Sequence, residues 1–172
     1  MYEPFPVSGP EAVPERPPPP RPVQNAVWLM YAGAALEVIS FVVALLTRSS
    51  LKKAILAAHP GYTAVQLHRA VVASMVVLAI GAVIAIGLWV WMAQANGRGL
   101  SWARVLSAVF FGINTLSLAV SLLARHTTAT VAGHTVATVI VGIAIWLVGL
   151  AAIVLIFSKD SAPFYAKRPR YG

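Results

Sequence analysis

Hydrophobic residues gather into four long runs separated by shorter polar segments. The runs cover about residues 26–46, 70–92, 102–123 and 135–157, and none of them contains proline. A run of about 20 apolar residues is what a helix needs to cross the ~30 Å hydrocarbon layer of a membrane. A helix also satisfies its own backbone amides, as lipid requires. The pattern therefore predicts an all-α integral membrane protein folded as a four-helix bundle.

The segments around these runs differ in character. Residues 1–25 form a tail that holds nine of the twelve prolines, and we expect this tail to be disordered. The first connection includes LKKAILAA, followed by His59, Pro60 and Gly61, which predicts a short interfacial helix that ends at this point. The second and third connections are short, and residues 159–172 form a basic tail.

Each run has one helical face of small and polar residues, which allows membrane helices to pack closely. These faces predict a compact bundle. On the first run the face comprises Ala26, Met30, Gly33, Glu37, Ser40 and Ala44. On the others it comprises Ala70, Ser74, Gly81 and Ala85; Ser107, Asn114, Ser117 and Ser121; and Thr135, Thr138, Gly142 and Gly149.

Glu37 is the only acidic residue within the four runs. Asn114 lies near the middle of the third run, at a matching depth, so we expect the two side chains to pair in a contact between the first and third runs. Ser40 and Ser117 lie on the same two faces. An ionised group at the centre of a bilayer costs at least ~2.5–3.5 kcal/mol. We therefore expect Glu37 to be mostly protonated and to donate a hydrogen bond.

Composition and charge agree with a membrane protein. The chain has 172 residues, of which 59% are hydrophobic and only 10% are charged, against about 25% in soluble domains. Its net charge of +8 does not indicate nucleic-acid binding, because the cations flank the apolar runs. In that position they orient helices and contact anionic lipid. The last three of them, which we expect to bind lipid, are Lys167, Arg168 and Arg170.

The distribution of basic residues predicts the orientation in the membrane. Eight Lys and Arg residues fall on the side of the two termini, and five fall on the side of the first and third connections. Because cytoplasmic segments are enriched in these residues, we expect both termini to be cytoplasmic. Trp28, Trp89, Trp91 and Trp102 then fall at the cytoplasmic boundary, where they would form an interfacial belt.

An intramembrane carboxyl group indicates either a structural contact or a proton site. The string YAGAALEVI, residues 31–39, resembles the first helix of small multidrug-resistance transporters. Those are four-helix proteins in which a membrane glutamate exchanges protons for cationic drugs. The resemblance implies one alternative function, a small proton-coupled transporter that acts as a homodimer around Glu37.

Four histidines, His59, His68, His126 and His134, fall in the first and third connections. Imidazoles on one side of the membrane could bind a metal or sense pH, which gives a second alternative. The sequence offers little for catalysis, because outside the proline-rich tail its only carboxylates are Glu37 and Asp160, at different depths. It also lacks the common hydrolase and phosphate-binding motifs. We expect no enzymatic activity and no cofactor.

The whole chain resembles uncharacterised four-pass membrane proteins of actinobacteria. The resemblance rests on the proline-rich start, the Val/Ala/Leu-rich runs, the YAGAA string and the closing SAPFYA. It implies a bacterial plasma membrane location. Together these features favour a non-enzymatic multi-pass membrane protein, an accessory or interaction subunit of a larger envelope assembly. Its partners would be the lipid bilayer and another membrane protein or a second copy.

Overall fold

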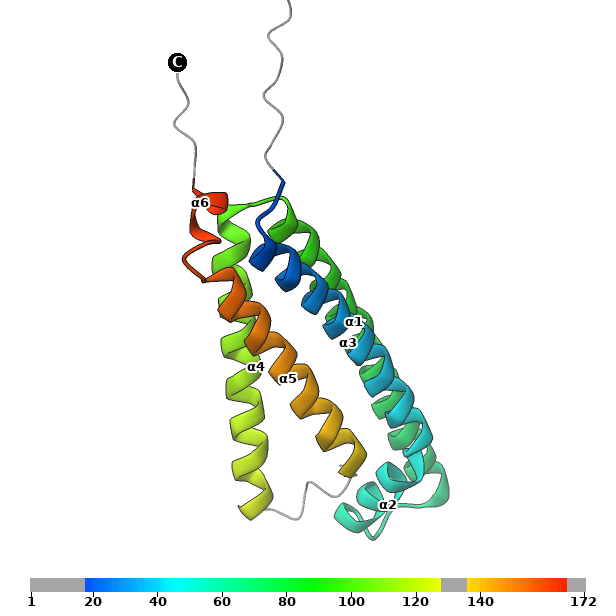
Figure 1. Ribbon diagram of the computed structural model, residues 1–172. Coiled ribbons are helices and arrows are strands. Elements are labelled where there is room, and N and C mark those ends of the chain that lie inside the picture. Colours follow the sequence, from blue (N-terminus) through cyan, green and yellow to red (C-terminus); the bar gives the residue numbers. More distant parts are fainter. Residues whose placement is uncertain (1–17, 128–135, 167–172) are drawn as a thin grey trace, which may run out of the picture.

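The computed structural model describes residues 18–127 and 136–166, and these residues are mostly helical (Figure 1). The helices are α1 Arg21–Leu46, α2 Arg48–Ala58, α3 Ala64–Gly97, α4 Ser101–Thr127, α5 Val136–Ile156 and α6 Ala162–Tyr165. Four of them, α1, α3, α4 and α5, contain stretches long and apolar enough to cross a membrane. The predicted all-α fold with four membrane-capable helices is confirmed.

The first helix begins earlier than the hydrophobic pattern indicated. Residues 21–25, expected to belong to the disordered tail, form the first turns of α1. Pro20 precedes the helix in an extended conformation and Pro22 lies in its first turn, where a missing amide hydrogen costs nothing. Val23 is fully buried, so packing holds this turn in place. Residues 1–17 of the expected tail lie outside the described part of the chain.

The first connection contains the short helix that the sequence predicted. Helix α2 ends at Ala58, and His59 is its C-terminal cap. The next helix starts with a capping box between Thr63 and Gln66. The Thr63 hydroxyl accepts from the Gln66 amide at 3.3 Å, and the Gln66 side chain accepts from the Thr63 amide at 2.8 Å. These reciprocal bonds fix where α3 begins.

A tight turn joins α3 to α4, and it depends on Gly99. This residue has φ +68°, the left-handed region that glycine adopts without steric cost. Its amide donates to the Asn96 carbonyl at 2.9 Å, and the Leu100 amide donates to the Ala95 carbonyl at 3.2 Å. The turn thereby caps the end of α3 and returns the chain as α4.

The helices pack closely at one end of the bundle and diverge toward the other (Figure 1). The closed end holds the start of α1, the end of α3, the start of α4, the end of α5, and α6. Helix α1 packs mainly against α3 and α5. The core consists largely of small residues at this end, among them Ala26, Ala93, Ala95, Ala103 and Ala152. Because small side chains let backbones approach, the helices meet where these residues occur.

The expected small-residue faces are therefore used only in part. Ala26, Met30 and Gly33 of α1, Ser107 of α4 and Gly149 of α5 are buried. By contrast, a methyl group placed at Gly81 of α3 or at Gly142 of α5 would meet no neighbouring atom within 4 Å. The bundle is compact at its closed end and open beyond it, rather than compact throughout.

Candidate functional site

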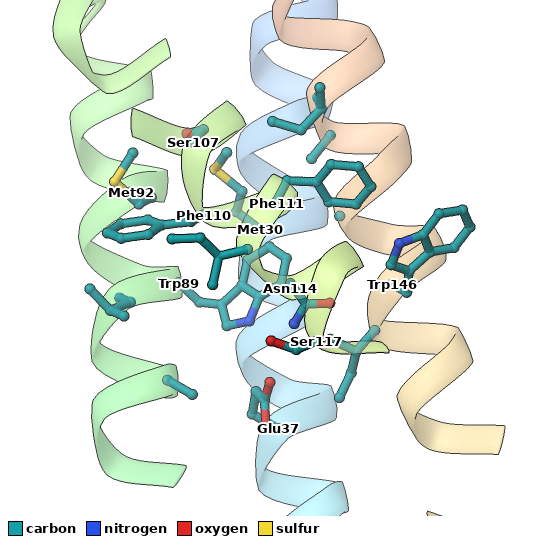
Figure 2. A pocket seen from close by; sticks show the side chains of 17 residues that line it. Met30, Glu37, Trp89, Met92, Ser107, Phe110, Phe111, Asn114, Ser117 and Trp146 are labelled. Atoms are coloured by element: carbon teal, nitrogen blue, oxygen red, sulfur yellow. The ribbon is translucent and has the colours of Figure 1, made fainter. Parts of the chain in front are cut away.

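A cavity of about 320 Å³ lies where the four long helices begin to separate (Figure 2). Its walls are mostly apolar and aromatic, and its few polar side chains are contributed by α1 and α4. The lining residues are Met30, Glu37, Ala85, Leu88, Trp89, Met92, Ser107, Phe110, Phe111, Ile113, Asn114, Ser117, Ile145, Trp146, Gly149, Ala152 and Ile153. An apolar pocket with a few convergent polar groups is the usual form of a ligand or partner site.

Trp89 of α3 lies close against α1 because Gly33 makes room for its ring. A methyl group placed at Gly33 of α1 would lie 2.9 Å from three atoms of the Trp89 ring. A methyl group at Gly149 of α5 would lie 3.6 Å from the same ring and 3.2 Å from Phe111. The indole thus lies against the backbone of α1, where a larger residue would clash with it, whereas at Gly149 the close neighbour is Phe111.

The Trp89 side chain lies within hydrogen-bonding reach of Glu37. The indole N–H can only donate, so the Glu37 carboxyl group accepts. Glu37 follows Gly33 by one helical turn, and its carboxyl group lies next to the indole in Figure 2. The bond links α1 to α3 within the region that would lie inside a membrane.

Asn114 and Ser117 of α4 contribute to the wall nearest Glu37 (Figure 2). Both side chains are exposed, as is the neighbouring Ile113, so the cavity is open on this side. Ala85 of α3 borders the same cavity. We call these four residues, Ala85, Ile113, Asn114 and Ser117, the open face.

The expected pairing of Glu37 with Asn114 changes in two respects, because its partner is Trp89 and because it accepts from this partner instead of donating. The structure brings both residues to the same cavity, but α1 packs mainly against α3 and α5 and not against α4. The hydrogen-bond partner that the structure gives Glu37 is Trp89. The reason is steric, because Gly33 leaves room for the large Trp89 indole directly beside the backbone of α1.

An aromatic contact closes the cavity between α4 and α5. The Trp146 indole donates to the Thr115 hydroxyl at 3.0 Å, and Thr115 in turn donates to the Phe111 carbonyl at 2.9 Å. The rings of Phe111 and Trp146 lie 5.8 Å apart. These contacts join α4 to α5 at a level where α4 has already separated from α3.

A buried polar cluster around Asn96 holds the closed end together. The Asn96 amide group donates to the Met92 carbonyl at 2.9 Å and to the Ser107 hydroxyl at 3.0 Å. The Tyr165 hydroxyl donates to the Asn96 side-chain oxygen at 3.1 Å. Burial raises the pKa of Tyr165 to about 12, although the nearby Arg104 charge opposes the shift. The cluster connects α3, α4 and α6. It occupies both N–H donors and the oxygen acceptor of the Asn96 side chain.

Arg104 lies beside this cluster and has aromatic partners. Its guanidinium lies 4.2 Å from the centre of the Phe157 ring and 5.8 Å from that of Tyr165. Cation–π contacts of this kind stabilise the positive charge of Arg104, which is half-buried. They also tie the start of α4 to the segment that follows α5.

The remaining predicted site residues lie elsewhere. Ser40 is half-buried on α1, one turn beyond Glu37, and does not line the cavity.

Three of the four predicted metal-binding histidines lie in different elements of the chain. The ring of His59 stacks on that of Tyr62, with 4.6 Å between the ring centres. His68 is exposed on α3, and His126 belongs to the last turn of α4. Within the described residues no group of three or more potential metal ligands is present. His134, and the three basic residues Lys167, Arg168 and Arg170 expected to bind lipid, lie outside the described part of the chain.

Sequence reasoning missed two residues that organise the site. Trp89 was expected in the interfacial belt, but it lies between helices, while Trp28, Trp91 and Trp102 are exposed. Trp89 and Trp91 are two positions apart on a helix, so they point to nearly opposite sides, and this spacing could have separated their roles. Asn96 falls beyond the predicted end of its apolar run, at residue 92, so the hydrophobic pattern gave no signal for it.

We compared the chain with family models, with curated proteins and with solved structures, and none of them matches.

Proposed function

We propose that the protein is a non-enzymatic accessory subunit of a larger assembly in a bacterial plasma membrane. In this proposal α1, α3, α4 and α5 span the membrane, both termini are cytoplasmic, and the open face receives the partner. The closed end provides a rigid base, since the Asn96 cluster and the small-residue core fix the helices there. At the other end of the bundle, the open face beside the cavity is the surface that the partner would cover.

One observation supports this proposal above the others. The Asn114 side chain is exposed on the open side of the cavity, on a stretch of α4 apolar enough to lie within a membrane. Moving an amide from water to hydrocarbon without a hydrogen bond costs roughly 4–8 kcal/mol. Polar side chains in membrane helices accordingly face protein or water-filled cavities. A bundle that exposes Asn114 at this depth is best explained if another component covers it.

The test compares two substitutions on the same helix. Asn114→Trp would fill the opening, whereas Leu116→Trp places the same side chain on an exposed apolar position that does not line the cavity. Complexes extracted in mild detergent are weighed by native mass spectrometry. We expect a stoichiometric foreign subunit that is lost in Asn114→Trp and retained in Leu116→Trp. Equal retention in both variants, or a clean monomer in the unmodified protein, would contradict the proposal.

The position of Glu37 supports a second candidate, a proton-coupled transporter that acts as a homodimer. Its carboxyl group reaches a cavity instead of being sealed between helices. A transporter of this kind would have the mass of a homodimer and would carry protons in vesicles. Glu37→Gln, which keeps an acceptor for Trp89, would then abolish proton flux while the fold survives. Unchanged flux in that variant would exclude this candidate.

A further inference from the structure

We infer that the partner at the open face is a transmembrane helix that carries a lysine or arginine at the depth of Glu37. This inference rests on the proposed function and names the chemistry of the partner. It comes from the Glu37 carboxyl group at the cavity, from the absence of basic residues in the four runs at this depth, and from the shape of the uncovered surface.

The Glu37 carboxyl group is incompletely partnered within the described residues. Its hydrogen-bond partner is Trp89, a single donor. A cation beside Glu37 would favour the ionised carboxylate over the neutral acid expected without one, and a carboxylate offers about four acceptor positions. The rest of the nearby wall is apolar except for Asn114 and Ser117, and both of these are on the open side. Intramembrane carboxylates usually pair with a basic group. A cation that enters from the open side would complete this site.

The four apolar runs of this chain do not supply that cation. The four runs carry no lysine or arginine near the level of Glu37. On α4, Arg104 precedes Asn114 by ten positions, roughly 15 Å along the helix, and it is engaged with Phe157. A second copy would bring the same helices and would face the same deficit. The charge must therefore come from a different molecule.

The uncovered surface has the form that a helix fits. Gly81, Ala85 and Trp89 follow one another at intervals of four along a single face of α3. Ala85 and Trp89 line the cavity, and Gly81, one turn further along, has open space where a side chain would be. The two small residues of this face, Gly81 and Ala85, allow a neighbouring helix to approach closely. An incoming helix that follows this face would carry its side chains past the cavity, and one basic side chain would reach Glu37.

The test uses synthetic transmembrane helices in place of the natural partner. Two probes of about 20 leucine and alanine residues differ only at the centre, which is lysine in one and leucine in the other. Each labelled probe is reconstituted with the labelled full chain in phosphatidylcholine vesicles, and association is measured by energy transfer. We expect the lysine probe to bind the unmodified protein roughly tenfold or more tightly than the leucine probe, a difference of about 1.4 kcal/mol.

In Glu37→Gln this preference should fall to near parity, while helix content by circular dichroism stays unchanged. Equal binding of both probes to the unmodified protein would overturn the inference. So would a lysine preference that survives Glu37→Gln, because the cation would then bind elsewhere. Glu37-dependent binding of octylammonium without any preference for the lysine probe would also overturn it, since a small cation would then be the occupant.

The outcome separates this inference from the proposed function on which it rests. If the lysine probe shows no preference while Asn114→Trp still releases a co-purifying subunit, the open face is a docking surface and only the basic partner is wrong. If neither experiment responds to the open face, the proposed function itself fails.

Discussion

Replacing Gly33 by alanine tests whether the Trp89 indole determines how α1 packs. The added methyl group would lie 2.9 Å from three atoms of the ring, whereas carbon atoms in contact normally lie about 3.5–4.0 Å apart. One of the two groups must therefore move by roughly 0.6–1 Å to restore that separation. The indole has little freedom to do so, because its other neighbours include the backbone at Gly149 and its N–H bonds to Glu37.

The expected cost follows from this overpacking. Forcing one extra methyl group into a well-packed site typically costs about 1–3 kcal/mol. Alanine also favours a helix over glycine by about 0.8–1.0 kcal/mol, which hides part of the cost. Gly87→Ala on α3 provides the matched control, since a methyl group there meets nothing within 4 Å. Both variants gain the same helix propensity, so their difference in stability reports the overpacking alone. Gly33→Ala should be less stable than Gly87→Ala by about 1–3 kcal/mol.

The assay is equilibrium unfolding in mixed micelles titrated with a denaturing detergent and followed by circular dichroism. A second comparison repeats Gly33→Ala in a protein that already carries Trp89→Ala. With the ring removed, the methyl group has space, and the substitution should no longer destabilise. The close contact of Gly33 with the Trp89 indole would be refuted as the basis of α1–α3 packing by either of two results. One is that Gly33→Ala is as stable as Gly87→Ala. The other is that Gly33→Ala lowers the free energy of unfolding equally with Trp89 present and with Trp89→Ala.

Three further predictions concern other contacts. Because the pKa of Tyr165 is raised to about 12 from its ordinary value of 10.0, the folded protein keeps the phenol proton longer than the unfolded chain. The free energy of unfolding that this shift contributes is complete below pH 10 and is lost as the pH rises toward 12. Tyr165→Phe has no phenol proton to lose, so its unfolding curves collected over that pH range should show less of this loss. Trp146→Phe removes the 3.0 Å bond to Thr115 and should cost about 0.5–1.5 kcal/mol in the same detergent titration, whereas a change of zero would mean that the bond is replaced. Gly99→Ala places a side chain at φ +68° and within 2.9 Å of Phe164, so we expect a loss of about 1–2 kcal/mol or more, and an unchanged midpoint would refute the tight packing of this turn.

The sequence was sufficient to predict the class of the protein. Four apolar runs of about 20 residues each indicate helices, because this is the length that a helix needs to cross a bilayer and because a helix bonds its own backbone groups in lipid. The same reasoning located α2 before Pro60 and identified Glu37 as the unusual residue of its run. It also placed Asn114 at the depth of Glu37, and both residues line one cavity in the structure. These features depend on composition and periodicity along one helix at a time.

Tertiary structure decided which helix meets which. Periodicity identifies the face of a helix but not its neighbour, and α1 could have packed on α4 as readily as on α3. The outcome depends on how one large side chain, Trp89 of α3, fits against Gly33 of α1, and no local pattern contains that information. The closed end likewise depends on Asn96 meeting residues far along the chain, among them Tyr165. Sequence alone determined a four-helix membrane protein with one acidic residue inside an apolar run, and the packing of the indole determined that this residue lies beside an open cavity.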